Sequence, residues 1–528
     1  MPVTCSKTVL INYMSTLVLL LGLLASGCAS LPDNTGRVES YGFTDGGGTL
    51  LHQVSATPHG VDPGQSGFLL LESGLDAFVA RAALARAAQR SIDAQYYLLH
   101  DDLTGHLFIN ELIQAAERGV RVRLLVDDMD LDGRELGAAA LDAMPNMEVR
   151  IFNPFGRNVN RWSQFVTRFG SVTRRMHNKT FIVDGQAVIL GGRNIGNEYF
   201  EADPALAFGD LDVLGIGPIA GAAVTSFDVY WNHDLAYPAT TLIGEMPDAD
   251  TIAHVRDQMA VYMDSQAVAY APYFTALSES RLARRLSAGE LPLIWGHAEL
   301  LADDPDKLLA DRRETDLHLS QALAPYFMGL KESLVIFSPY FVPGAEGTDF
   351  FKALVERGVQ VRILTNSLAS TDVPIVHVGY VRHRRALLRA GVELYEMSRK
   401  VRPEQHKRSF FTGSSKASLH AKSFVLDGRH VFIGSLNLDP RSLVENTEVG
   451  VIIDAPEFAA RMLDWFERDA DQVAFRVVLE TGDDGVERLR WHGLDEGQPV
   501  TFTVDPYTSI WQRMGVGILR VLPIDSQL

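Results

Sequence analysis

Short apolar runs of strand length alternate along the chain with longer stretches in which apolar residues recur at helical spacing. Residues 91–99 and 120–126 have the character of strands, and residues 105–118 between them have the spacing of an amphipathic helix. Residues 75–88 are also helical in spacing, and residues 147–155 supply another strand. This alternation of helix and strand predicts an α/β fold.

The same pattern returns in the second half of the chain. Residues 356–364 (ERGVQVRIL) repeat residues 117–125 (ERGVRVRLL) at an offset of 239 (356 − 117), and residues 333–341 match residues 91–99. A nearly constant offset over about 100 residues indicates duplication of a whole domain. Two such domains packed around an approximate two-fold axis place equivalent hairpins opposite each other.

One ten-residue stretch occurs in both copies. It reads MHNKTFIVDG at residues 176–185 and LHAKSFVLDG at residues 419–428, and an asparagine follows each histidine by 17 residues (194 − 177 and 437 − 420). β-branched and aromatic residues that stop at Asp-Gly predict a hairpin, and residues i and i+2 of a strand share a face. Each histidine therefore projects beside the lysine two residues on. We interpret Asp184 and Asp427, at the turns, as structural residues that orient the hairpins.

Two such hairpins facing each other bring two imidazoles, two ammonium groups and two amides to one pocket, a set that suits a phosphodiester. One imidazole can attack phosphorus and form a phospho-histidine intermediate. The other can protonate the leaving alcohol and then deprotonate the incoming one, while lysines and asparagines hold the non-bridging oxygens. The residues by themselves treat the two histidines as equivalent, and nothing in the set demands a metal ion or a cofactor.

The two H-x-K-x4-D motifs, followed by G-G-x-N at 191–194 and G-S-x-N at 434–437, resemble those of the phospholipase D superfamily. The resemblance implies two pseudo-symmetric α/β/α sandwich domains that share one active site. It implies that the catalytic residues are His177, Lys179, Asp184, His420, Lys422 and Asp427, and that the phosphate-binding residues are Asn194, Asn437 and Ser435. It also implies an acidic residue that orients each histidine, for which Asp212 and Glu448 occupy matching places. In the family the amino-terminal histidine is usually the nucleophile, so we expect His177 to attack and His420 to serve as acid and base.

Charge bears on the class of substrate. The net charge of −18, from 48 Lys and Arg against 66 Asp and Glu, argues against a nucleic-acid partner. Two basic runs depart from this balance: residues 157–175 hold five arginines and no acid, and residues 382–408 hold nine Lys and Arg against three Glu. Each lies just upstream of one motif and is either a solvated face or a positive rim that gathers anionic headgroups.

The amino terminus carries a targeting pattern. Residues 1–27 hold one lysine, no acid and an apolar core at 17–24, which is typical of a secretory signal peptide. The sequence Ala25-Ser-Gly-Cys28 resembles a bacterial lipoprotein cleavage site, at which Cys28 becomes the lipidated first residue; an uncleaved anchor is the alternative. By the bacterial sorting rule, Ala29 favours the outer membrane. We therefore expect a lipid-anchored envelope protein on the periplasmic side, in contact with the membrane.

These patterns divide the chain into six parts. The signal peptide (1–27) precedes a flexible tether (28–67), a first domain (68–240), a linker or insertion (241–325), a second domain (326–475) and a tail (476–528). In the tail Trp511, Met514, Ile518 and Leu522 recur at helical spacing. This amphipathic helix either packs on the catalytic body or lies in a lipid headgroup layer.

Within the superfamily, the chain most resembles bacterial cardiolipin synthases of the C type. The closer match rests on RIFNPF at 150–155, GGRNIGNEY at 191–199, DLDV at 210–213, WGH at 295–297 and the tail around Trp511. It implies a phosphatidyltransferase that forms cardiolipin from phosphatidylglycerol and a second phospholipid, either phosphatidylglycerol or phosphatidylethanolamine. A phospholipase D hydrolase that releases phosphatidic acid is the alternative, and a nuclease or a non-catalytic lipid-binding envelope protein is less favoured.

Overall fold

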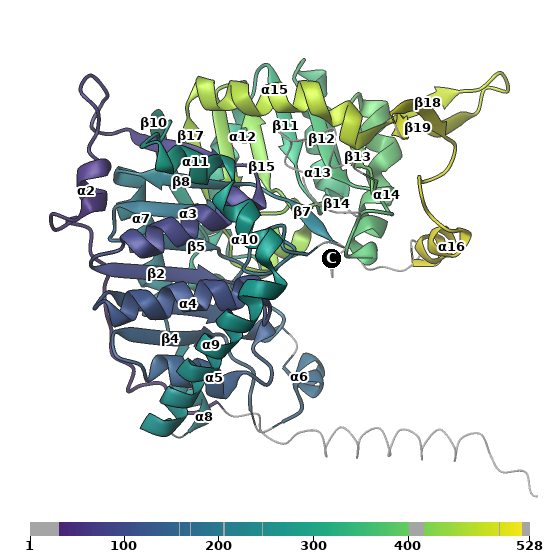
Figure 1. The fold of residues 1–528 in the computed structure, drawn as a ribbon. Coiled ribbons are helices and arrows are strands. Elements are labelled where there is room, and N and C mark those ends of the chain that lie inside the picture. Colours follow the sequence, from purple (N-terminus) through teal and green to yellow (C-terminus); the bar gives the residue numbers. More distant parts are fainter. Residues whose placement is uncertain are drawn as a thin grey trace, which may run out of the picture.

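The first half of the protein is a mixed sheet with helices on both faces (Figure 1). A computed structural model describes residues 31–519 except 158, 169, 204–205, 245, 401–416 and 496. In spatial order the strands of this sheet are β1 (Ser66–Leu71), β8 (Asp212–Ile216), β6 (Ala187–Gly191), β5 (Thr180–Val183), β2 (Ser91–Tyr96), β3 (Arg121–Asp127), β4 (Met147–Phe152) and β9 (Ala236–Pro238). Strands β2, β3 and β4 run parallel, because a helix returns the chain between them.

The second half repeats this order strand for strand. Its sheet consists of β10 (Ile294–Ala302), β17 (Val449–Asp454), β16 (His430–Gly434), β15 (Ser423–Leu426), β11 (Ser333–Phe337), β12 (Gln360–Asn366), β13 (Glu393–Met397) and β18 (Ala474–Thr481). Two further strands, β19 (Glu487–Asp495) and β20 (Gln498–Phe502), extend its outer edge. The repeat read from the sequence is therefore a repeat of the whole sheet.

Equivalent helices cover the two sheets. One face carries α3 (Gly74–Ala87), α4 (Leu103–Glu117) and α5 (Glu135–Asp142) in the first half, and α12 (Leu319–Met328), α13 (Gly344–Glu356) and α14 (Pro374–Ala390) in the second. Local signals set their ends: the Asp102 side chain accepts from the Gly105 amide at the start of α4, and Gly391 in the left-handed region ends α14. The opposite faces carry α7 (Pro218–Trp231) and α15 (Pro456–Val473). Each half is thus an α/β/α sandwich.

The halves join at two places. Strands β1 and β10 pair antiparallel at Phe68–Ile294, so the two sheets are continuous. Nearer the motifs, β7 (Ala207–Gly209) pairs parallel with β14 (Ala417–Leu419), and Met176 bridges to Thr447. One buried core that includes α7 and α15 lies between the sheets, while each outer helical layer has a core of its own. This arrangement brings the two predicted hairpins together.

Three predicted boundaries differ from the structure. The described part of the predicted tether, from residue 31, lies along the first half, where the Gly42 amide donates to Asp228 and α2 (Leu50–Val54) begins at a Thr49 cap. The predicted linker supplies β10, which pairs with both β1 and β17. The predicted tail supplies strands of the second sheet, because β19 pairs with β18. A long-range hydrogen bond decides the first boundary and strand pairing decides the other two, and the local pattern does not report either.

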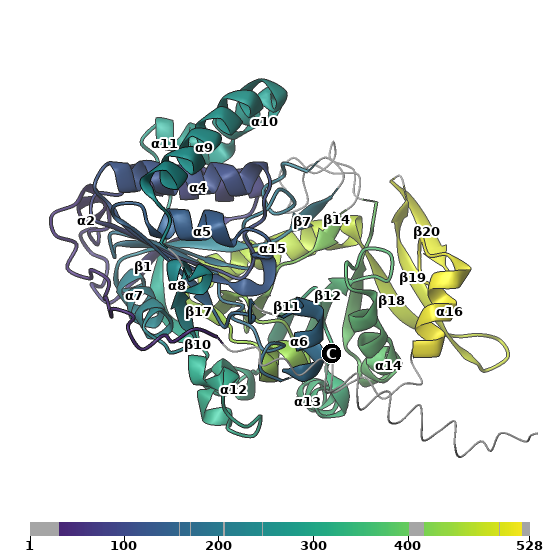
Figure 2. The same cartoon turned by 90° about the horizontal axis from the view of Figure 1, so that it is seen from below.

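The segment between the halves also supplies three helices without a counterpart in the second half. They are α9 (Ala249–Ala269), α10 (Ala271–Ser278) and α11 (Arg281–Ser287), and Figure 2 shows them above α4 at the outer face of the first half. Helix α9 contacts α4 and α5, and α10 and α11 contact α3. Among the described residues no helix combines the length and the apolar character needed to cross a bilayer.

Candidate active site

Both motif hairpins end in the same turn. Asp184 and Asp427 adopt positive φ values of 53° and 50°, and a glycine with positive φ follows each. The Asp184 carboxylate accepts from the backbone amides of residues 89–91, and the Asp427 carboxylate accepts from those of residues 331–333. Both acids therefore fix the start of the neighbouring strand, β2 or β11. Their carboxylates are directed to the backbone, which supports the structural interpretation and not a direct catalytic one.

The two histidines are held across the boundary between the halves. His177 Nδ1 lies 2.8 Å from a carboxylate oxygen of Glu448, and His420 Nδ1 lies 2.6 Å from one of Asp210. The backbone crosses in the same way, since the His177 amide donates to the Thr447 carbonyl and the His420 amide to Gly209. Each imidazole is thus fixed through Nδ1 by the opposite half, so Nε2 is the ring nitrogen that can react with a substrate.

The prediction that Asp212 orients a histidine is wrong. The residue in that place is Asp210, as the strand register shows. Gly191 pairs with Asp212, and the equivalent Gly434 pairs with Gly450. Asp210 and Glu448 each lie two residues before the partner of their glycine, so they are the equivalent acids. Asp212 instead forms a buried ion pair with Arg81 at 2.8 Å. Two acids two residues apart share one strand face, so the sequence alone gives no means to choose between them.

The two motif lysines are buried beside their histidines. Lys179 and Lys422 are each 1% exposed. Lys422 Nζ lies 2.8 Å from Nδ1 and 3.1 Å from Nε2 of His420, and Lys179 Nζ donates to the His177 carbonyl. Each lysine therefore shares the strand face of its histidine, as the spacing predicted.

The residues after the hairpins differ between the halves. Asn437 has an amide oxygen without a hydrogen-bond partner and an amide nitrogen 3.4 Å from Ser442 Oγ, so its side chain is available to a ligand. Asn194 is engaged on both sides, because it accepts from the Leu98 amide and donates to the Tyr199 hydroxyl at 2.9 Å.

The prediction that Ser435 binds phosphate is not supported. Its hydroxyl donates to the Glu448 carboxylate and accepts from the Val449 amide, so it steadies the acid behind His177. The first half has Gly192 in the equivalent position, where a Cβ atom would lie 2.2 Å from Asp210. Glycine is required there because the Asp210 carboxylate lies too close to the backbone of residue 192 to leave room for a Cβ atom.

The two histidines differ in the charges that act on their pKa values. Burial, followed by the charges of Lys179 and Lys422, lowers the pKa of His177 well below its usual value, and His420 contributes to the same shift. Burial and Lys422 also lower the pKa of His420, but Asp210 opposes them. Burial raises the pKa of Asp210, yet His420 and Lys422 outweigh it and the net shift is downward. Burial raises the pKa of Glu448 to about 7 and lowers that of Lys422 to about 8.

Aromatic rings that the motifs did not predict wall the site. The ring centroid of Tyr97 lies 5.0 Å from that of His177. Tyr199 and Phe208, both from the first half, lie 5.2 and 5.1 Å from His420. Tyr199 falls within the GGRNIGNEY motif, which gave a signal for it; no local pattern pointed to Phe208, which the pairing of β7 with β14 brings to His420.

The first basic run is neither a solvated face nor a simple positive rim. Arg175 is buried against Asp127, Arg157 pairs with Asp128 at 2.7 Å, and Arg174 lies 3.0 Å from Glu445 of the other half. These three arginines are neutralised by acids and join structural elements. The end of the second run, residues 401–408, and Cys28 lie outside the described residues.

Comparison with known proteins agrees with this geometry. A family model described as "Cardiolipin synthase, PLD-like domain" matches residues 81–206 and 327–470, one segment in each half. The chain is 40% identical over 469 residues to cardiolipin synthase C of Escherichia coli, covering 88% of this chain and 96% of that protein. It is 34% identical to an uncharacterized protein of Helicobacter pylori, covering 96% and 98%.

A solved structure shares the fold. The phosphatidylserine synthase of Haemophilus influenzae superposes with a TM-score of 0.52 at 15% identity, covering 80% of this chain and 90% of that one. At 15% identity this similarity supports a shared fold and no more. With two crossed histidine–carboxylate pairs in a duplicated sandwich, and the family match in both halves, the chain belongs to the cardiolipin synthase family of phospholipase D-like proteins.

Proposed function

We propose that this protein is a phosphatidyltransferase that makes cardiolipin through a phospho-histidine intermediate. The observation that carries the proposal is the crossed pair of contacts, His177 with Glu448 and His420 with Asp210. It gives one site two imidazoles that are each held through Nδ1, so that Nε2 is the nitrogen proposed to react; Lys422 Nζ lies 3.1 Å from Nε2 of His420. The family match and the relative named cardiolipin synthase C support the choice of lipid.

In the first step, His177 Nε2 attacks the phosphorus of a phospholipid donor, phosphatidylglycerol or phosphatidylethanolamine. The bond from phosphorus to the headgroup oxygen breaks, and that oxygen takes a proton from His420 Nε2. The nucleophile must be neutral and the acid protonated. Burial lowers the pKa of both histidines, but Asp210 acts to raise that of His420, and this difference favours His420 as the acid.

In the second step, His420 takes the proton from a hydroxyl of phosphatidylglycerol, whose oxygen attacks the phosphatidyl group. The bond from phosphorus to His177 breaks, which restores the imidazole and releases cardiolipin. Lys179, Lys422 and Asn437 are proposed to hold the non-bridging oxygens as charge redistributes in both steps. Water in place of the second lipid gives phosphatidic acid, the product of the alternative hydrolase.

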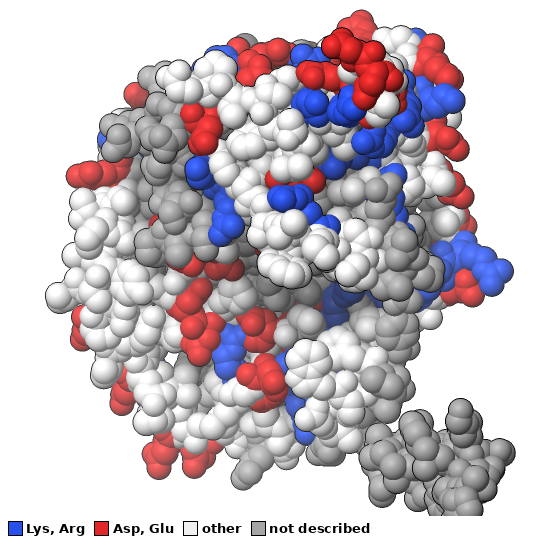
Figure 3. All heavy atoms as spheres, turned by 90° about the vertical axis from the view of Figure 1, so that its right-hand side faces the viewer, with Lys and Arg blue, Asp and Glu red and all other residues white. Residues whose placement is uncertain are grey.

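We also propose that α16 (Ile510–Leu519) contacts the membrane. None of its residues is buried, and Trp511, Ile518 and Ile510 are 75%, 64% and 61% exposed. An exposed tryptophan among aliphatic residues suits the boundary between lipid headgroups and hydrocarbon. Figure 3 looks at this end of the molecule, where an uncharged area adjoins Lys and Arg side chains that suit anionic headgroups.

The proposed reaction is tested with purified protein and vesicles of phosphatidylglycerol, with and without phosphatidylethanolamine, followed by separation of the lipid products. Cardiolipin is the expected product. Phosphatidic acid alone would replace the transferase with a hydrolase, and no lipid product would overturn both. The reaction is expected to persist in a chelator, because no step above uses a metal.

The cellular location of the protein is a separate proposal. Cys28 is proposed to carry a lipid that anchors the protein in the outer membrane, with the site on the periplasmic side. Incorporation of labelled palmitate that is lost in Cys28→Ala supports this anchor. Unchanged incorporation in that variant would exclude it, and recovery in the inner-membrane fraction would exclude the outer-membrane address.

A further inference from the structure

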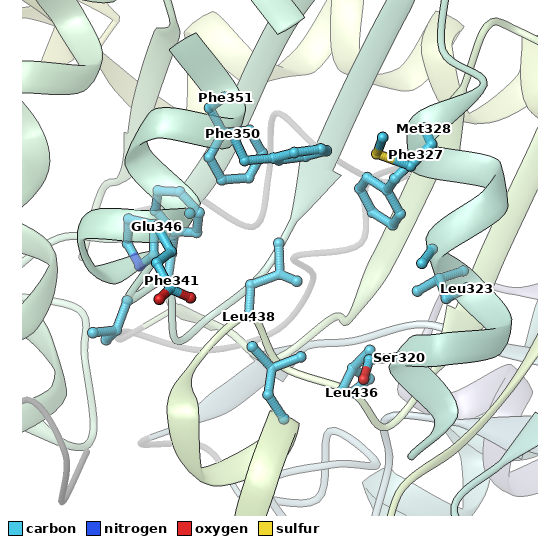
Figure 4. A pocket seen from close by; sticks show the side chains of 15 residues that line it. Ser320, Leu323, Phe327, Met328, Phe341, Glu346, Phe350, Phe351, Leu436 and Leu438 are labelled. Carbon is cyan, nitrogen blue, oxygen red and sulfur yellow. The ribbon is translucent and has the colours of Figure 1, made fainter. Parts of the chain in front are cut away.

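The second half contains an apolar cavity next to the catalytic centre. Between α12 and α13 the second half has a cavity of about 370 Å³ (Figure 4). Its lining is aromatic and aliphatic, and Ser320 and Glu346 are the charged or hydroxyl-bearing side chains in it. Figure 4 shows Phe327 and Phe350 projecting toward the middle of the cavity from opposite helices. A lining of this kind has few hydrogen bonds to offer and suits hydrocarbon.

The cavity shares a wall with the catalytic centre. Leu436 and Leu438 line it, and they are the sequence neighbours of Asn437, whose amide is available in the site. Phe341, also in the lining, bridges to Leu438. Side chains alternate along an extended segment, so this segment turns leucines to the cavity and Ser435 and Asn437 to the other side. A ligand in the cavity therefore contacts both neighbours of Asn437.

The equivalent helices of the first half have different neighbours. There α3 and α4 are covered by the inserted helices: the Leu282 amide of α11 donates to Asp76 of α3, and the Tyr273 hydroxyl of α10 donates to the Phe200 carbonyl. Ile252 and Met259 of α9 pack on the same core. In the second half the chain after β18 forms β19, β20 and α16, and α16 lies beside α14. On this face the first half has a cavity of its own, of about 510 Å³, between α4, α5 and α9, and Asp101, His106 and Arg134 are among its lining residues. The cavity between α12 and α13 differs in its more uniformly apolar lining.

We propose that the cavity between α12 and α13 binds one acyl chain of the phospholipid substrate. This inference rests on the proposed function, because it assigns a subsite for the same lipid. The phosphate would lie on the Asn437 side of the shared wall and the hydrocarbon on the leucine side. A headgroup is unsuited to the cavity, since its lining holds no cationic side chain and one carboxylate.

Two alanines on α12 provide a matched test. Ala324 lines the cavity and is exposed at its edge, whereas Ala322 is also exposed on the same helix but does not line it. Ala324→Trp should fill the opening and lower kcat/KM for dioleoyl phosphatidylglycerol by about tenfold, equivalent to losing burial of about two methylene groups. It should leave kcat/KM for soluble dihexanoyl phosphatidylglycerol within about twofold, because a short chain gains little from the cavity. Ala322→Trp should leave both values near wild type.

Equal loss on both substrates in Ala324→Trp, or no loss on either, would overturn the acyl-chain site. Wild-type protein that yields no lipid product would instead overturn the proposed function. The two failures are therefore separable within one set of assays.

A binding measurement independent of turnover completes the test. The inactive His177→Ala protein is incubated with vesicles that contain phosphatidylglycerol with a photoreactive diazirine near the end of one acyl chain. Crosslinks are expected on peptides of α12 and α13, and Ala324→Trp in the same background should remove them. Crosslinks confined to α16 would mean general contact with the bilayer and would overturn the subsite. Crosslinks to a copurified protein at α12 and α13 would likewise overturn it in favour of a protein partner.

Discussion

The two halves repeat one fold but complete the site with different side chains. The first half offers a short acid, Asp210, against Gly192, and the second offers a longer acid, Glu448, against the hydroxyl of Ser435. Each acid serves the histidine of the opposite half. Duplication therefore supplied two equivalent hairpins, and later differences around them made two chemically distinct histidines.

The difference has an electrostatic consequence. The pKa of Asp210 is lowered, so it is ionised at neutral pH and supports a positive charge on His420. The pKa of Glu448 is raised to about 7 by burial, so His177 has a partner that is only partly ionised there. A neutral imidazole suits a nucleophile and a more basic one suits an acid and base. The comparison teaches that a symmetric fold can divide labour through the groups behind its reacting atoms.

The largest expected effect comes from the histidines themselves. His177→Ala and His420→Ala should each lower cardiolipin formation by about 10⁴-fold or more, because either step then lacks a nucleophile or a proton donor. A phosphatidyl ester of p-nitrophenol distinguishes them, since this leaving group departs without a proton. With it, His420→Ala should still release nitrophenolate in a burst and trap acid-labile phospho-histidine, whereas His177→Ala should not. The reverse pattern would exchange the two roles.

The next largest effect is expected from substituting the carboxylates that contact the two histidines. Asp210→Asn should lower kcat by about 10² to 10⁴-fold at pH 7, because His420 loses an ionised partner. Wild-type kcat/KM should rise with pH through about 7 as Glu448 ionises, because the carboxylate then stabilises the positive charge that His177 acquires when it attacks phosphorus, and should fall above about 8 as Lys422 loses its proton. Glu448→Gln removes the group responsible for the rise, so the ascending limb should move to lower pH while the descending limb stays. The measurement is a pH profile of each variant.

Asp212→Asn is the control for Asp210. It leaves Arg81 unpaired in the core, which should cost about 3–5 kcal/mol of unfolding free energy, measured by denaturant titration. The folded fraction should keep the wild-type pH profile. A changed profile would return Asp212 to the catalytic centre and contradict the observed pairing.

Exchanging the small residues behind the acids should have unequal effects. Gly192→Ser places a Cβ atom against Asp210, so the carboxylate must move and turnover should fall by about 100-fold. Ser435→Gly removes one hydrogen bond to Glu448 and should cost about fivefold. Comparable losses in the two variants, each assayed for cardiolipin formation with matched thermal stability, would remove the proposed difference between the halves.

The last expected effect concerns membrane contact and leaves catalysis unchanged. Trp511→Ala on α16 should weaken binding to anionic vesicles by about tenfold, measured by cosedimentation, and leave turnover of soluble short-chain lipid unchanged. Trp162→Ala is the matched control, because Trp162 is 80% exposed on α6 (Arg161–Thr167) of the first half. Equal weakening in both variants would mean that the two halves meet the membrane together.

Local sequence determined much of this protein. Apolar spacing gave α4 between β2 and β3, the repeated ERGV segments gave the duplication, and the Asp-Gly turns with period-two strands placed His177 beside Lys179. The motif residues could be assigned because hairpins, caps and turns depend on neighbours within a few positions.

Tertiary structure alone decided the rest. His177 meets Glu448 271 positions away, and His420 meets Asp210 210 positions away, so the choice of Asp210 over Asp212 followed from strand register. The neighbouring charges that separate the pKa values of Asp210 and Glu448, the cavity beside Leu438, and the strand β10 within a predicted linker have the same origin. Each depends on contacts between distant segments, and a side chain acquires its charge state and its neighbours only when those segments pack together.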